Sequence, residues 1–178
     1  MDDLEKFFIR ELRQSDKVNK LSLGSEEYAP LKIFLRKSAH DFHFNNVAKT
    51  YVLVNEEEVA RIWGYMSLMC SEITLDGHQR PSESESAQRY DTFPAVKIAR
   101  LAIDKSLQSN GFGLAFIAQA IALVKYYIMP TVGCRFLTVD SKPKAIKFYE
   151  GAGFVLFDHK DNERNPNPLM LLDMHNYK

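Results

Sequence analysis

Residues 94–140 constrain the fold more than any other part of this sequence. Pro94–Ile103 has the apolar, β-branched character of a strand, and Asp104–Asn110 is a polar connection. Gly111–Met129 then carries apolar residues at helical spacing, and Arg135–Asp140 has strand character again. A strand, a helix and a second strand in this order predict a crossover that joins two parallel strands of one sheet.

Further elements are expected on both sides of this unit. Helices are predicted for Leu4–Leu12, within an extension of residues 1–16, for Leu31–Phe42, and after Ser141, which we expect to cap a helix ending near Gly151. Strands are predicted for Val18–Leu23, Thr50–Asn55, Ala60–Leu75, Phe154–Asp158 and Leu169–His175. The sequence therefore predicts an α/β (α+β) fold in a single domain over residues 1–178. Its sheet is mixed and largely antiparallel, with a central parallel strand pair flanked by helices.

Composition excludes several classes of protein. Apolar residues make up 46% and charged residues 26% of the 178-residue chain, which is typical of a folded domain. Lysine plus arginine and aspartate plus glutamate both number 23, so there is no overall basic excess of the kind usual in nucleic-acid-binding proteins. Cys70 and Cys134 show no metal-binding spacing, and two buried thiols are expected in preference to a disulfide. No leader and no apolar run long enough to span a membrane is expected, so we predict a cytoplasmic location.

Residues 76–92 lack any apolar period and contain the alternating Ser-Glu run Ser82–Ser86. Two interpretations fit this segment. It is either a mobile loop beside the functional site, whose acidic residues favour an amine substrate, or simply disordered.

The connection before the long helix has the chemistry of an anion site. Backbone N–H groups at a helix start lack partners within the helix, and the helix dipole favours negative charge there. Glycines at positions 111 and 113 would let a diphosphate approach the backbone, although glycine also serves helix packing. A third glycine of the dinucleotide-binding motif and the Gly-Lys-Ser/Thr of a P-loop are both missing. The residues concerned are Gln108, Ser109, Asn110, Gly111, Phe112 and Gly113.

Three motifs together resemble the GNAT acetyltransferases. They are Ala99–Asp104, the Gln-x-x-Gly-x-Gly loop Gln108–Gly113, and Ala145–Phe154 with its Phe-Tyr-Glu-x-x-Gly-Phe run. The resemblance implies acetyl-CoA as cosubstrate, with no metal, and a parallel strand pair that splays apart. It implies that the loop binds the pyrophosphate and that Tyr149 is the general acid for the departing thiolate. It also implies that the pantetheine arm pairs with the backbone of Leu101, Ala102 and Ile103.

Within that family the sequence looks most like toxins that acetylate the α-amine of aminoacyl-tRNA. That branch implies an antitoxin partner of the ribbon-helix-helix type; we also consider a homodimer. Because Pro94–Ile103 carries no Asp, Glu or His, an acceptor amine of low pKa is favoured. Glu72, Asp76 and His78 are reserve candidates for a general base, and Arg100 is a candidate for orienting substrate or for structural pairing. The alternatives are an acetyltransferase for a small amine or a protein N-terminus, and a non-catalytic acyl-CoA-binding module.

Overall fold

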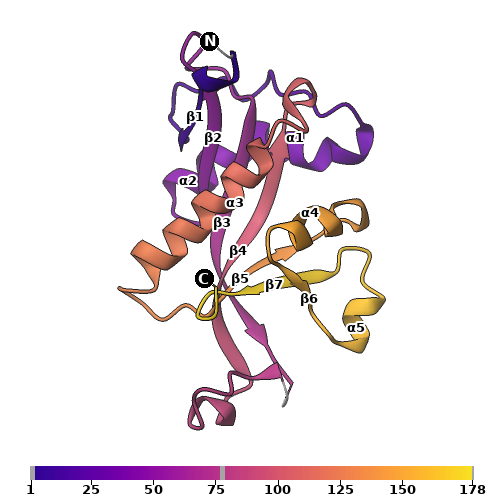
Figure 1. The fold of residues 1–178 in the computed structure, drawn as a ribbon. Coiled ribbons are helices and arrows are strands. Elements are labelled where there is room, and N and C mark those ends of the chain that lie inside the picture. Colours follow the sequence, from indigo (N-terminus) through magenta and orange to yellow (C-terminus); the bar gives the residue numbers. More distant parts are fainter. Residues whose placement is uncertain (1–2, 77–78, 178) are drawn as a thin grey trace. The chain divides into compact units, whose positions relative to one another are not determined.

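A computed structural model describes residues 3–76 and 79–177 (Figure 1). Its strands form one seven-stranded sheet in the order β1-β2-β3-β4-β5-β7-β6. The strands are β1 (Phe7–Glu11), β2 (Lys49–Asn55), β3 (Gly64–Thr74), β4 (Thr92–Ile103), β5 (Phe136–Asp140), β6 (Val155–Leu156) and β7 (Leu169–Asp173). The sheet is mostly antiparallel with a parallel β4–β5 pair, which confirms the predicted fold class.

Five α-helices accompany these strands in the part of the chain that the structure describes. They are α1 (Ala29–Lys37), α2 (Ala39–Phe44), α3 (Phe112–Leu123), α4 (Ile146–Gly151) and α5 (Lys160–Glu163). A π-helical turn over Val124–Ile128 extends α3, so the predicted long helix is confirmed nearly in full. Short 3-10 turns at Lys105–Leu107 and Pro143–Ala145 precede α3 and α4.

The chain divides into two compact units. The first comprises Met1–Met69 and Ile98–Gln119, and the second comprises Cys70–Lys97 and Ala120–Lys178. Each has its own buried apolar cluster, and β3 and β4 each contribute residues to both units.

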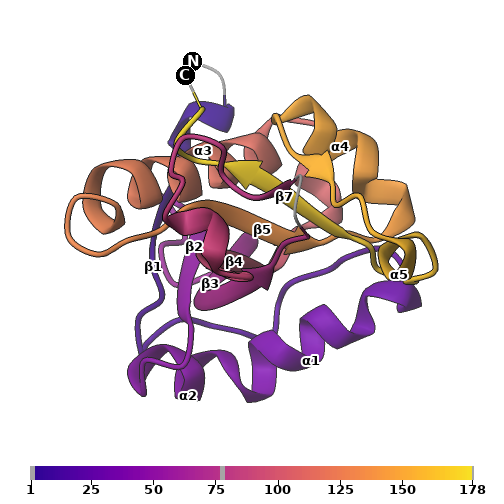
Figure 2. The same ribbon diagram turned by 90° about the horizontal axis from the view of Figure 1, so that it is seen from below.

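In the first unit, β1, β2 and β3 pair antiparallel, with Phe7 opposite Asn55 and Lys49 opposite Leu68. Figure 2 shows α1 and α2 on one face of these strands and α3 on the other. The cluster under α1 includes Phe34, Leu35 and the fully buried Tyr65. Side chains that alternate along the strands therefore meet a helix on each face, which explains why residues 50–54 of β2 are all buried.

In the second unit, β5 pairs antiparallel with β7, and β7 pairs with β6. The amide of Arg135 donates to the carbonyl of Pro94 at 2.9 Å, which ties the start of β5 to β4. Phe93 and Phe136 form an edge-to-face pair in the buried cluster of this unit, with ring centroids 6.4 Å apart.

The predicted N-terminal helix over Leu4–Leu12 is wrong beyond its first turn. A 3-10 turn ends at Lys6, and Phe7–Glu11 is the edge strand β1. Three consecutive residues of high β propensity, Phe7 to Ile9, gain a full antiparallel ladder against β2, and this pairing outweighs the helical spacing.

The predicted strand over Val18–Leu23 is also wrong. Leu21 and Leu23 are buried as their alternation suggested, but the backbone has no strand partner. Instead the amide of Ser22 donates to the Asp104 carboxylate at 2.8 Å, and its carbonyl accepts from the amide of Lys105. A buried side chain thus replaces the strand partner.

Smaller corrections concern element boundaries. The helix predicted over Leu31–Phe42 is two helices that meet at Ser38. The second hairpin strand starts at Gly64 and not at Ala60. Ser141 does not cap α4, because its hydroxyl donates to the carbonyl of Lys142 at 3.0 Å.

Candidate active site

The loop Gln108–Gly113 has a shape that its own residues determine. The Gln108 side-chain amide donates to the carbonyl of Ile103 at 3.1 Å, which folds the loop back on the end of β4. Ser109 and Gly111 have φ values of 66° and 83°, in the left-handed region. A β-carbon on Gly111 would meet no atom within 4 Å, so the backbone angle, and not crowding, explains the glycine.

The start of α3 presents free backbone donors beside this loop. The amide of Ala115 donates to the carbonyl of Gly111 at 3.0 Å, which is the first α-type bond. The amides of Phe112, Gly113 and Leu114 therefore have no carbonyl four residues earlier in the helix to which they could donate. Residues 108–111 are exposed, so an anion can reach these donors.

The strand end before the loop is fixed by Asp104, a role that the sequence analysis missed. Its carboxylate is buried and accepts from the amides of Ser22 and Ser106 and from the Ser106 hydroxyl. Its own amide donates to the carbonyl of Trp63 at 2.7 Å. The Asp-x-Ser spacing could have predicted the turn in which the carboxylate accepts from the amide two residues later. The bond from Ser22 could not be predicted in this way, because its partners are far apart in the sequence.

Leu101, Ala102 and Ile103 lie at the end of β4, where β3 comes very close. A β-carbon on Gly64 would sit 2.9 Å from Cδ1 of Ile103 and 3.0 Å from the carbonyl oxygen of Ala102. Glycine is therefore required at the start of β3. Through the bond from Gln108, the structure brings these strand residues and the loop together in the first unit.

Tyr149 lies on α4 in the second unit and is 6% exposed. Its ring packs edge-on against Phe148 and Phe154, with centroids 5.0 and 5.6 Å away. Burial raises the pKa of the phenol to about 12, so it is protonated at neutral pH. Its carbonyl accepts from the amides of Ala152 and Phe154, which closes the turn after α4 around Gly153.

The reserve candidates for a general base, and Arg100, do not come together as one group in the described residues. Glu72 is exposed on β3, and the Asp76 carboxylate is 3.5 Å from Nε2 of His159. His78 lies outside the described residues. The guanidinium of Arg100 stacks 3.6 Å above the ring of Phe34.

Among residues 3–76 and 79–177, no three His, Cys, Asp or Glu side chains are grouped to hold a metal ion. Cys70 and Cys134 are both free thiols; Cys134 is buried as predicted, but Cys70 is exposed. In this described part of the chain, no helix is both long and apolar enough to cross a membrane.

Comparison with known proteins places this geometry in context. The family model of the GNAT acetyltransferase domain matches residues 83–176. Among solved structures, a Tyr-to-Phe mutant of KacT is 26% identical, with a TM-score of 0.78 over 96% of each chain. AtaT complexed with acetyl-methionyl-tRNAfMet is 26% identical, with a TM-score of 0.77 over 95% of each chain. AtaTR bound with acetyl-CoA is 24% identical and shares the fold, with a TM-score of 0.73 over 96% of this chain and 95% of that chain.

Proposed function

The chain belongs to the GNAT acetyltransferase family, and from that premise we propose that it acetylates the α-amine of an aminoacyl-tRNA. Membership makes it an acetyl-CoA-dependent acetyltransferase. The observation that carries the choice of acceptor is the likeness to AtaT, which was solved with acetyl-methionyl-tRNAfMet and matches this chain over nearly its whole length.

Acetyl-CoA binding is assigned to the first unit. The exposed loop and the free amides of Phe112, Gly113 and Leu114 suit the diphosphate, because donors and helix dipole both favour anions there. Gln108, Ser109, Asn110 and Gly111 shape this cradle. The backbone of Leu101, Ala102 and Ile103 would pair with the pantetheine arm.

The reaction is a direct attack of the amine nitrogen on the acetyl carbonyl carbon. The carbon–sulfur bond breaks as the amide forms, and the proton of the Tyr149 phenol goes to the departing thiolate. With a phenol pKa of about 12 and a thiolate pKa near 8.5, this transfer is uphill by about 5 kcal/mol. We therefore infer that bound substrates lower the pKa of Tyr149 before it donates. The phenolate regains its proton from the attacking amine through water.

The acceptor needs little help to lose its proton. An α-amine has a pKa near 7.7–8.0, which is more than about two pH units below the pKa of a lysine side chain. We assign no side chain as general base, because Glu72 is exposed and Asp76 faces His159. Water serves as the first proton acceptor.

A cell-free translation assay tests this function. With acetyl-CoA present, the wild-type protein should stop translation and should convert methionyl-tRNA to its N-acetyl form, detected by mass spectrometry. Tyr149→Phe should retain acetyl-CoA binding and lose about 100-fold or more in rate, since a general acid contributes about that much. Tyr90→Phe, at a 68% exposed tyrosine, is the matched control and should behave as wild type. Full activity of Tyr149→Phe would disprove the assignment of the acid.

A toxin of this kind requires a neutralising partner. A Tyr-to-Phe mutant of AtaT was also solved bound to the C-terminus of the antitoxin AtaR, which supports an antitoxin as a partner here. We propose that this antitoxin is of the ribbon-helix-helix type. Growth arrest on expression of the chain alone, relieved by Tyr149→Phe, is the expected phenotype. Normal growth together with activity on a small amine would instead favour a stand-alone acetyltransferase.

A further inference from the structure

Arg100 is a half-buried cation with no carboxylate beside it in the described part of the chain. It lies on β4 directly before Leu101, the first of the residues assigned to the pantetheine arm. Its guanidinium stacks on Phe34 of α1 at 3.6 Å, and no hydrogen bond or ion pair accompanies this stacking. The charge is thus held in place but not neutralised.

Four other arginines of the described residues are also partly buried, but their charges have partners. Each pairs with a carboxylate: Arg10 with Asp16, Arg61 with Glu58, Arg80 with Asp91, and Arg135 with Asp173. Their side chains are 12%, 29%, 23% and 17% exposed, respectively. Removing a cation from water is costly unless an anion compensates it. The missing carboxylate at Arg100 therefore points to an anion that comes with a ligand.

The platform under Arg100 is rigid. Phe34 is buried and stacks with Tyr65 at a centroid distance of 6.3 Å, and the Tyr65 hydroxyl donates to the carbonyl of Leu31 at 2.7 Å. Stacking uses the flat face of a guanidinium and leaves the N–H donors in its plane available. Arg100 is thus pre-organised to donate several hydrogen bonds to one oxyanion.

This anion differs from the cofactor diphosphate. Ala102, two residues along the same strand, belongs to the buried cluster that contains Phe34 of α1. Alternation along β4 therefore places Arg100 on the α1 face, whereas α3 and its N-terminal donors lie on the other face (Figure 2). The cofactor's other phosphate is on the ribose beyond the diphosphate, at the end away from the pantetheine arm, and so also away from Arg100, which directly precedes Leu101. The acceptor is then the remaining source of an anion.

We propose that Arg100 binds a backbone phosphate at the 3′ end of the aminoacylated RNA, an inference that rests on the proposed function. The ester bond to tRNA consumes the carboxylate of the amino acid. The nearest anions to the α-amine are then the last phosphodiesters of the acceptor strand. Arg100 is a positioning residue that holds this strand while the amine reaches the thioester.

A binding experiment tests the contact without catalysis. The probe is an RNA minihelix ending in CCA, compared with the same RNA carrying uncharged methylphosphonates at its last two linkages. The wild-type protein should bind the native RNA roughly 10-fold more tightly than the neutralised one. Arg100→Gln should bind both equally, and its salt slope for native RNA should be smaller by about 0.7.

Controls separate this contact from general attraction and from misfolding. Arg164→Gln removes the same charge from an exposed arginine after α5 and should leave the preference for native linkages unchanged. Arg100→Lys should keep part of the preference, and thermal unfolding of each variant should match wild type. Equal losses for Arg100→Gln with native and neutralised RNA would overturn the proposal.

Turnover gives a second readout. With methionyl-CCA trinucleotide as acceptor, Arg100→Gln should raise KM about 10-fold and leave KM for acetyl-CoA unchanged. With methionyl-adenosine, which lacks phosphates, wild type and variant should be equal. If the wild-type protein acetylates neither acceptor, the proposed function fails. The binding comparison of native and neutralised RNA still decides whether Arg100 contacts a phosphate.

Discussion

Two connections of this chain, the loop Gln108–Gly113 and the acidic loop of residues 79–91, are held in different ways. The first is fixed locally, by left-handed backbone at Ser109 and Gly111 and by a side-chain bond that spans five residues. The second is fixed partly by Arg80 within it and partly by Arg135, which lies 52 residues from its partner Glu83. A loop of the first kind can be predicted from its own residues, whereas a loop that depends on distant partners cannot.

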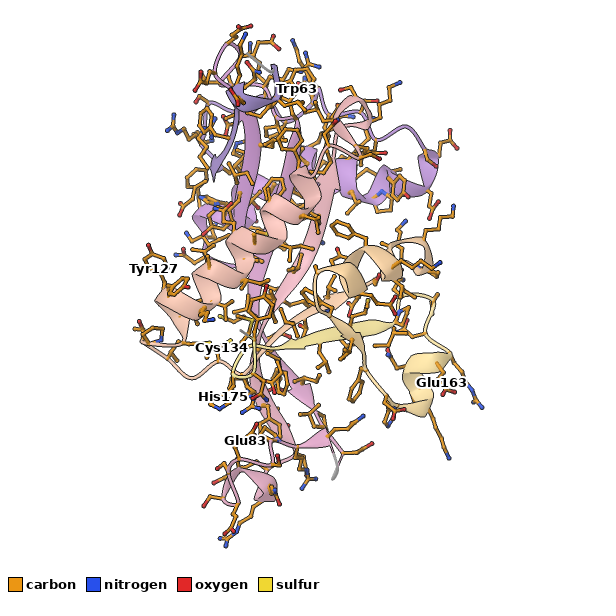
Figure 3. The ribbon with its side chains drawn as sticks, viewed as in Figure 1. Trp63, Glu83, Tyr127, Cys134, Glu163 and His175 are labelled. Atoms are coloured by element: carbon orange, nitrogen blue, oxygen red, sulfur yellow. The ribbon has the colours of Figure 1, made fainter. Side chains whose placement is uncertain are left out.

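Two arginines hold the acidic loop. Arg80 donates to the carbonyls of Leu75 and Gln88 and pairs with Asp91. Arg135, at the start of β5, pairs with Asp173 at 2.6 Å and with Glu83 at 3.3 Å. Figure 3 labels Glu83 on this loop and His175 just after β7. Residues 79–91 are therefore folded, and disorder is the wrong interpretation of this part.

The largest expected effect comes from Gly111→Val in the locally fixed loop. A β-branched residue at a φ of 83° costs about 1–2 kcal/mol and places methyl groups where the diphosphate would lie. We expect acetyl-CoA affinity, measured by isothermal titration calorimetry, to fall by about 100-fold. Gly133→Val, at an open position without positive φ, is the matched control. Wild-type affinity in Gly111→Val would show that the diphosphate binds elsewhere.

The loop Gln108–Gly113 was predictable because its determinants lie in six consecutive residues. The parallel strand pair followed from the same local order of strand, helix and strand. In contrast, β1 was missed because its stability depends on pairing with β2: Phe8 lies opposite Val54, 46 residues later in the sequence. The Glu83–Arg135 pair spans 52 residues and leaves no local pattern. The sequence likewise could not show that Arg100 lacks a carboxylate.

A smaller effect is expected from Arg135→Gln in the second connection. The change removes the charge that joins Glu83 to Asp173 while the Arg135 side chain is only 17% exposed. We expect the free energy of unfolding, from urea titration followed by circular dichroism, to fall by about 1–3 kcal/mol. Acetyl-CoA affinity should stay at the wild-type value, because the two connections lie in different units. Arg135→Lys should recover part of the stability; a variant as stable as wild type would contradict the clamp.

The smallest effect is a pH dependence that belongs to the acidic loop alone. Hydrogen bonds from Asn176 and Arg135 lower the pKa of Glu83 to about 2 from the usual 4.5. A carboxyl whose folded pKa is depressed contributes stability above its unfolded pKa and loses it as the pH falls. The contribution of Glu83 should therefore be complete above pH 4.5 and should disappear toward pH 2.

Glu83→Gln tests this contribution. Between pH 2 and pH 4.5, the unfolding midpoint of this variant should depend less steeply on pH than that of the wild type. Above pH 4.5, the two slopes should be nearly the same. Glu85→Gln, two residues away, is the control and should retain the wild-type slope, because Glu85 is exposed and the bonds from Arg135 and Asn176 go to Glu83. If Glu83→Gln also retained that slope, Arg135 would be held by Asp173 alone, and the acidic loop would not depend on its distant partner.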